Sequence, residues 1–113
     1  MAQAPPSDHA VMADPLWQQA QDRAIREAFS QDVEGWLAES LALITRWDDI
    51  DVAAIRTSLV WYHGPHDRNA PLSAAQRLVA RIPSARLVVW PEAGHFETYH
   101  REAEVLDELL ART

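Results

Sequence analysis

Two short apolar runs in the second half of the chain stand out from its hydrophobic pattern. They cover residues 58–62 (Ser-Leu-Val-Trp-Tyr) and residues 86–90 (Arg-Leu-Val-Val-Trp), and each ends at a loop that contains glycine. Continuous apolar runs of this length, bounded by turn residues, are typical of strands buried on both faces, as in a parallel sheet. Residues 71–82 between the runs are long enough for the crossover helix that parallel strands need.

The first half of the chain has helical periodicity. Asp14-Pro15 is a typical helix start, in which a carboxylate can accept hydrogen bonds from free amides and proline occupies the first helical position. Two apolar stripes at helical spacing follow, and a third stripe predicts a last helix over about residues 98–112. The stripes consist of Trp17, Ala20, Ala24, Ile25, Ala28 and Phe29; of Val33, Trp36, Leu37, Leu41 and Ile44; and of Val105, Leu106, Leu109 and Leu110.

These elements predict an α/β protein with a single folded unit. Residues 1–13 are small and polar and contain prolines, so we predict a disordered tail or a leader into the first helix. Residues 14–113 should form one unit, in which two helices in residues 14–47 precede a strand–helix–strand–helix block in residues 48–113. The 113 residues, of which 48% are hydrophobic and five are Trp, suit one small domain that buries about two-thirds of its unfolded surface.

Composition and charge argue against nucleic-acid and membrane partners. The net charge is −7 and the ten basic residues, all Arg, are scattered, which argues against nucleic acid because phosphate neutralisation needs clustered cations. No apolar run approaches the roughly 20 residues that span a bilayer, and residues 1–9 lack the basic and apolar regions of a signal peptide. The absence of Cys excludes disulfides and a thiolate nucleophile. We therefore expect a cytoplasmic protein with no membrane partner.

The loop after each apolar run carries a residue capable of acid–base chemistry. Asp67 follows the first run and His95 follows the second. Because parallel strands end at one edge of the sheet, where ligands bind in open α/β folds, we expect the two side chains to lie side by side. A metal cluster of both with His63 and His66 is the alternative, but their spacing matches no metal motif, so neither a metal nor a cofactor is expected.

Three stretches together resemble one known family. They are residues 61–71 (Trp-Tyr-His-Gly-Pro-His-Asp-Arg-Asn-Ala-Pro), Ile82-Pro83, and residues 91–96 (Pro-Glu-Ala-Gly-His-Phe). They resemble the C-terminal part of an α/β-hydrolase, in which the penultimate strand ends in His-Gly-x-x-Asp and the last strand ends in Gly-His. The resemblance covers residues 48–113, and the helices before them resemble the family's cap. It implies a partial α/β-hydrolase fold: two parallel strands with crossover and C-terminal helices, preceded by two cap-like helices.

The same resemblance implies roles for two residues. Asp67 matches the acid of a nucleophile–His–Asp triad, and His95 matches its base. The implied activity is ester-type hydrolysis of a small apolar substrate. The bond cleaved stays open, because the acid–histidine pair also serves dehalogenases, epoxide hydrolases and C–C hydrolases. Taken alone, Asp67 would be interpreted as a turn or capping carboxylate; its pairing with His95 favours the triad role.

The chain departs from the family at the nucleophile. The family's nucleophile lies on a Gly-x-Ser-x-Gly elbow upstream of the cap, whereas this chain has three glycines and no Ser between two of them. The hypothesis is therefore a C-terminal fragment of a hydrolase that is inactive alone and is completed by an N-terminal half. The alternative is a non-catalytic remnant or partner, which docks or self-associates through its open strand edge.

Four side chains have two interpretations each. Trp17, Trp36 and Trp47 could line an apolar substrate pocket under a cap, or they could form the seam between helices, which we favour. We expect His63 to pack or hydrogen-bond structurally rather than react, because it lies on the shoulder of the first strand.

Overall fold

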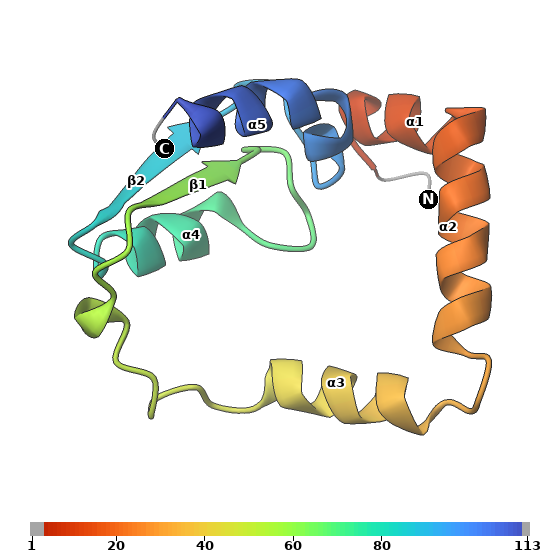
Figure 1. Ribbon diagram of the computed structural model, residues 1–113, viewed down its shortest axis with the longest axis horizontal. Helices are drawn as coiled ribbons and strands as arrows, with labels where there is room; N and C mark the ends of the chain where they lie inside the picture. Colours follow the sequence, from red (N-terminus) through yellow and green to blue (C-terminus); the bar gives the residue numbers. More distant parts are fainter. Residues whose placement is uncertain (1–3, 112–113) are drawn as a thin grey trace.

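The structure, a computed structural model, describes residues 4–111 (Figure 1). In these residues none of the helices is long and apolar enough to cross a membrane. The helices and strands are α1 (Pro6–Met12), α2 (Pro15–Ala28), α3 (Glu34–Ile44), the 3₁₀ helix η1 (Val52–Ala54), β1 (Leu59–His63), α4 (Leu72–Val79), β2 (Ala85–Val89), the 3₁₀ helix η2 (Glu97–His100) and α5 (Glu102–Leu110).

The two apolar runs form a two-stranded parallel sheet, with α4 as the crossover. β1 and β2 pair in register, with Trp61 opposite Leu87 at the centre. Helix α4 packs against one face of the strands and α5 lies along the other, where the Tyr62 hydroxyl donates a hydrogen bond to Glu108 (Figure 1). The prediction of a mixed α/β fold with a parallel strand pair is confirmed, and the strand bounds differ from the predicted ones by one residue.

Helix α2 begins at the capping residue that the sequence indicates. The Asp14 carboxylate accepts a hydrogen bond from the amide of Leu16 at 2.7 Å, and Pro15 occupies the first position of α2, as predicted.

The last predicted helix is divided, because residues 97–100 form a 3₁₀ turn before α5 begins. Tyr99 lies within this turn, and aromatic residues favour helices weakly. Arg112, the predicted end of that helix, lies outside the described residues.

The predicted tail contains a helix. Residues 1–3 lie outside the described residues, but α1 spans Pro6–Met12, begins after Pro5 and packs against η2. Its Val11 side chain is fully buried, and Asp8 is 4% exposed. The sequence predicts either a disordered tail or a leader into the first helix for residues 1–13. The described residues 4–13 do not form a disordered tail, because α1 lies directly before α2. A two-turn helix of this kind shows no stripe in the sequence, because its stability comes from the surface on which it packs.

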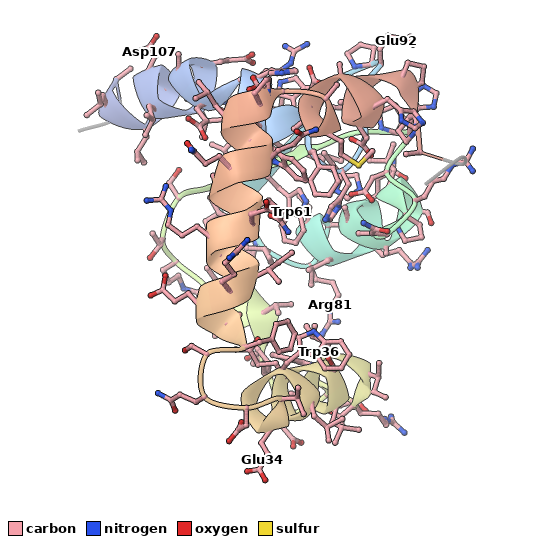
Figure 2. The ribbon with its side chains drawn as sticks, turned by 90° about the vertical axis from the view of Figure 1, so that its right-hand side faces the viewer. Glu34, Trp36, Trp61, Arg81, Glu92 and Asp107 are labelled. Carbon is pink, nitrogen blue, oxygen red and sulfur yellow. The ribbon has the colours of Figure 1, made fainter. Side chains whose placement is uncertain are left out.

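Helices α2 and α3 are only loosely attached to the rest of the chain. Neither fully buries a residue, and Leu43 and Ile44 of α3 are 75% and 80% exposed. Figure 2 shows α3, with Trp36, at the end of α2 remote from α1. The chain exposes 8757 Å², whereas a compact protein of this mass exposes about 6,300 Å². The expected two-thirds burial is therefore wrong; the chain buries roughly half of its unfolded surface, because α3 has no facing apolar layer within residues 4–111.

Candidate active site

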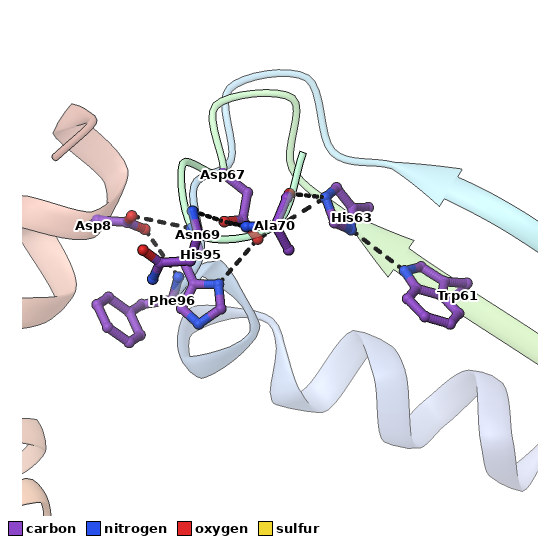
Figure 3. A network of polar contacts seen from close by, with 8 residues as sticks. All are labelled: Asp8, Trp61, His63, Asp67, Asn69, Ala70, His95 and Phe96. Atoms are coloured by element: carbon purple, nitrogen blue, oxygen red, sulfur yellow. Dashed lines mark hydrogen bonds and ion pairs between the residues drawn. The ribbon is translucent and has the colours of Figure 1, made fainter. Parts of the chain in front are cut away.

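The two loops that carry the acid–base residues Asp67 and His95 meet beyond the carboxyl ends of the strands. Asp67 lies in the loop from β1 to α4, and His95 lies in the loop from β2 to η2 (Figure 3). The loops are joined by their backbones, because the amide of His66 donates to the carbonyl of Ala93 at 3.0 Å. The sheet edge thus brings together two residues that are 28 positions apart, as the strand pattern predicts.

A hydrogen bond joins the two side chains. His95 Nδ1 lies 3.0 Å from Asp67 Oδ2, and the Asp67 side chain is 8% exposed whereas that of His95 is 41% exposed. An ionised carboxylate only accepts hydrogen bonds, so Nδ1 carries the proton and donates it. The Nε2 atom of His95 makes no hydrogen bond within residues 4–111, and it is the nitrogen that can take up a proton.

The environment of Asp67 keeps its carboxylate ionised at neutral pH. Burial by itself raises the pKa of Asp67, but the hydrogen bonds from His95, Ala70 and Asn69 and the charge of His95 outweigh it and lower the pKa below its usual value. The amides of Asn69 and Ala70 donate to Oδ1 at 2.8 and 2.9 Å. One oxygen of Asp67 thus caps the turn and the other accepts the hydrogen bond from His95, whereas the triad role of Asp67 stays a prediction.

His63 has a structural position. Its Nδ1 accepts the Trp61 indole N–H at 3.3 Å, and its Nε2 lies 2.8 Å from the carbonyl of Ala70, to which it donates in the same tautomer. The side chain is 7% exposed, so it anchors the loop that carries Asp67. His66 is exposed, and within the described residues no group of three or more His, Cys, Asp or Glu could hold a metal ion.

Asp8 is a member of the site that sequence reasoning missed. Its Oδ2 accepts the backbone amide of His95 at 3.0 Å, and its Oδ1 accepts that of Phe96 at 2.9 Å (Figure 3). A Cβ atom on Gly94 would lie less than 3.0 Å from the Asp8 carboxylate, so the approach needs glycine there. An acidic residue in the first turn of a helix is a common pattern, and nothing local in the sequence indicates that it reaches residue 95.

A cavity of about 290 Å³ opens beside His95. Phe96 contributes to its wall and is in turn packed against Trp17 of α2, with ring centroids 5.3 Å apart. Trp36 instead contacts Phe29, at the seam between α2 and α3. The cavity is lined by Ala4, Pro5, Asp8, Met12, Arg68, Asn69, His95 and Phe96. Its size suits a small molecule, and within residues 4–111 no serine or threonine hydroxyl makes a hydrogen bond to His95.

Gly64 should be sensitive to substitution for a packing reason. A Cβ atom there would lie less than 3.0 Å from backbone atoms of Ala93, which cannot move without breaking the link between the two loops. We expect Gly64→Ala to lower the free energy of unfolding by about 1–3 kcal/mol, measured by urea denaturation. Gly35→Ala is the matched control, because nothing lies within 4 Å of its Cβ position in α3. If Gly64→Ala were as stable as the control, the close approach of the loops would be wrong.

No protein-family profile, curated protein or solved structure matches the chain. The assignment of a function therefore depends on the geometry of Asp67 and His95 and on the residues around them.

Proposed function

We propose that this chain is the C-terminal part of an α/β-hydrolase of the ester type, with Asp67 as the acid and His95 as the base of a nucleophile–His–Asp triad. The observation that carries the proposal is the 3.0 Å contact between His95 Nδ1 and Asp67 Oδ2 at the ends of two adjacent parallel strands. In this arrangement the nucleophile lies on polypeptide outside the chain, because residues 1–113 contain no Gly-x-Ser-x-Gly elbow.

The pair would act through the free nitrogen of His95. Nε2 takes the proton of the attacking hydroxyl, and Asp67 stabilises the resulting imidazolium through Nδ1–H. The hydroxyl oxygen bonds to the ester carbonyl carbon, the bond to the alcohol oxygen breaks, and the imidazolium gives its proton to that oxygen, which leaves an acyl-enzyme. A water molecule that Nε2 deprotonates then attacks the acyl-enzyme and releases the acid, and the proton returns to the nucleophile. The cavity beside His95, with Phe96 and Met12 on its wall, supports a small apolar ester-like substrate.

A second candidate function is docking to another polypeptide through the open edge of the sheet. Within residues 4–111 the two strands pair only with each other, so each has one edge without a strand neighbour. The surface in excess of a compact protein, about 2,500 Å², includes the uncovered apolar residues of α3. It is well above the roughly 800 Å² that each partner buries in a standard interface. Light scattering of the purified chain tests this function: an oligomer or aggregate supports it, and a sharply melting monomer contradicts it.

The isolated chain should not hydrolyse esters at the rate of an enzyme with a complete catalytic triad. We expect it to hydrolyse p-nitrophenyl acetate no faster than an equal concentration of free imidazole, because His95 has no nucleophile to activate. The matched variants are His95→Ala and, as a control on an exposed side chain, His66→Ala. A much faster rate that His95→Ala abolishes and His66→Ala preserves would mean that the chain holds its own nucleophile.

The proposal itself is tested on the polypeptide from the cells that produce it. We expect the protein containing the Gly94-His95 peptide either to exceed 12.8 kDa in intact mass or to copurify with a second chain. A fluorophosphonate probe should then label a serine outside residues 1–113, and His95→Ala should abolish the labelling whereas His66→Ala should not. A mass near 12.8 kDa with no labelled serine in the preparation would overturn the proposal.

A further inference from the structure

We propose that Asp8 is a positioning residue for His95: its carboxylate holds the two consecutive backbone amides of His95 and Phe96 and thereby sets the direction from which the imidazole meets Asp67. The inference rests on the proposed function, because it gives a role to the loop that carries the base.

Both oxygens of Asp8 are used by this contact. Oδ2 accepts from the amide of His95 at 3.0 Å and Oδ1 from that of Phe96 at 2.9 Å. Consecutive amides that converge in this way form a concave site for an anion, and hydrogen bonds to a carboxylate are stronger than those between neutral groups. A bidentate contact restricts both the position and the rotation of the peptide between the two residues. It therefore sets the backbone from which the His95 side chain projects.

The carboxylate is itself firmly held. Asp8 is 4% exposed, and Val11, one turn further along α1, is fully buried. Helix α1 also packs on η2, the element that directly follows His95 and Phe96. We call the contact of Asp8 with the two amides the Asp8 clamp. It connects α1 with the residues before η2, and Asp8 and His95 are 87 residues apart in the sequence.

The neighbouring glycine is consistent with the same contact. Gly94 precedes the first clamped amide, and its Cβ position is occupied by the Asp8 carboxylate. Three charged groups surround the His95 side chain and backbone: Asp8, Asp67 and, on the wall of the same cavity, Arg68. Asp67 holds the imidazole at Nδ1, whereas Asp8 holds only the backbone, so each carboxylate supplies a restraint that the other cannot replace.

The first experiment compares the pairing of His95 with Asp67 in the wild-type chain, Asp8→Asn and Asp14→Asn by NMR. Asp8→Asn keeps the shape but loses the charge and one acceptor. Asp14→Asn changes a carboxylate that caps the start of α2 and is hydrogen-bonded to Tyr99 of η2, but that contacts neither the His95 amide nor the Phe96 amide. We expect Asp8→Asn to move or broaden the His95 Nδ1–H signal and to shift the carboxyl ¹³C signal of Asp67, because the hydrogen bond between the two side chains is displaced. Asp14→Asn should change neither. A folded Asp8→Asn chain with both signals as in the wild type would overturn the inference and leave Asp8 a structural residue.

A second measurement needs no variant. Couplings through the hydrogen bonds, from the amide nitrogens of His95 and Phe96 to the carboxyl carbon of Asp8, should be detectable in the wild-type chain, and their absence from a folded sample would also overturn the inference. Because neither readout requires turnover, a failure of the hydrolase proposal would leave both results unchanged. In an assembly that hydrolyses an ester, Asp8→Asn should lower kcat by about 100-fold with KM unchanged, since a misplacement of about 1 Å has an effect of this size.

Discussion

Asp67→Asn should lower kcat by about 10⁴-fold in an assembly that contains the nucleophile, while the fold stays intact. The structure gives the reason. The amides of Asn69 and Ala70 both donate to Oδ1, so the introduced amide would keep its oxygen there and turn its NH₂ group toward His95. Nδ1 of His95 must then accept, and the proton moves to Nε2. A histidine in that tautomer cannot take the proton of a nucleophile.

Two measurements check this result. The kcat is compared with that of Asp107→Asn, which changes an exposed carboxylate of α5 that Figure 2 shows at the surface. The tautomer of His95 is observed directly by ¹⁵N NMR in the isolated chain, where no activity is needed. An Asp67→Asn chain that keeps the Nδ1–H tautomer, or an assembly that keeps its kcat, would contradict the triad role of Asp67.

The same variant should change how stability depends on pH. The pKa of Asp67 is lower in the folded state than in the unfolded chain, so its carboxylate stabilises the fold above the unfolded pKa of about 3.9. That contribution is lost as the pH falls through the lowered pKa of the folded state. The stability of the wild-type chain relative to Asp67→Asn should therefore be constant from pH 7 to about pH 5 and decrease below that range.

Trp90→Ala should lower the free energy of unfolding by about 3–5 kcal/mol, the largest stability effect that we expect in this chain. Trp90 is 4% exposed and directly follows β2. Its ring stacks on Tyr62 with centroids 4.8 Å apart, and the Arg101 guanidinium lies 5.1 Å from its centre. Its indole N–H donates to Glu104 at 3.0 Å, so the substitution both leaves a cavity and removes a polar contact between the sheet and α5.

Urea denaturation measures the loss, and Trp36→Ala is the matched control. Trp36 is 57% exposed on α3, so its removal should change stability by less than about 1 kcal/mol. A total stability of roughly 6–17 kcal/mol is typical for 113 residues, so at the low end of this range the Trp90→Ala chain keeps only about 1–3 kcal/mol. The indole N–H is the largest cause of the lowered pKa of Glu104, followed by Arg101, and this pKa should rise in the variant. Equal effects of the two tryptophan substitutions would contradict the described core.

Much of the sheet and its two loops could be predicted from local pattern. The apolar runs at residues 58–62 and 86–90 correspond to β1 and β2, and the intervening segment forms α4. Because parallel strands place their carboxyl ends together, the contact between Asp67 and His95 follows from two local patterns and one rule of sheet topology. The catalytic role of the pair stays a prediction.

Two features of the fold have no local signature in the sequence. The first is the helix over Pro6–Met12, whose Asp8 carboxylate binds the His95 loop 87 residues away. This helix and its contact depend on a surface that exists only once the sheet has formed. The exposure of α3 is decided in the same way, because its apolar residues predict a buried helix but the described chain contains no layer to cover them. The parallel pair, its crossover and the acid–base loops can thus be predicted from the amino-acid sequence, since they depend on short-range periodicity and turn residues. Packing between distant segments instead sets which carboxylate holds the backbone amide of His95 and which apolar surfaces stay uncovered.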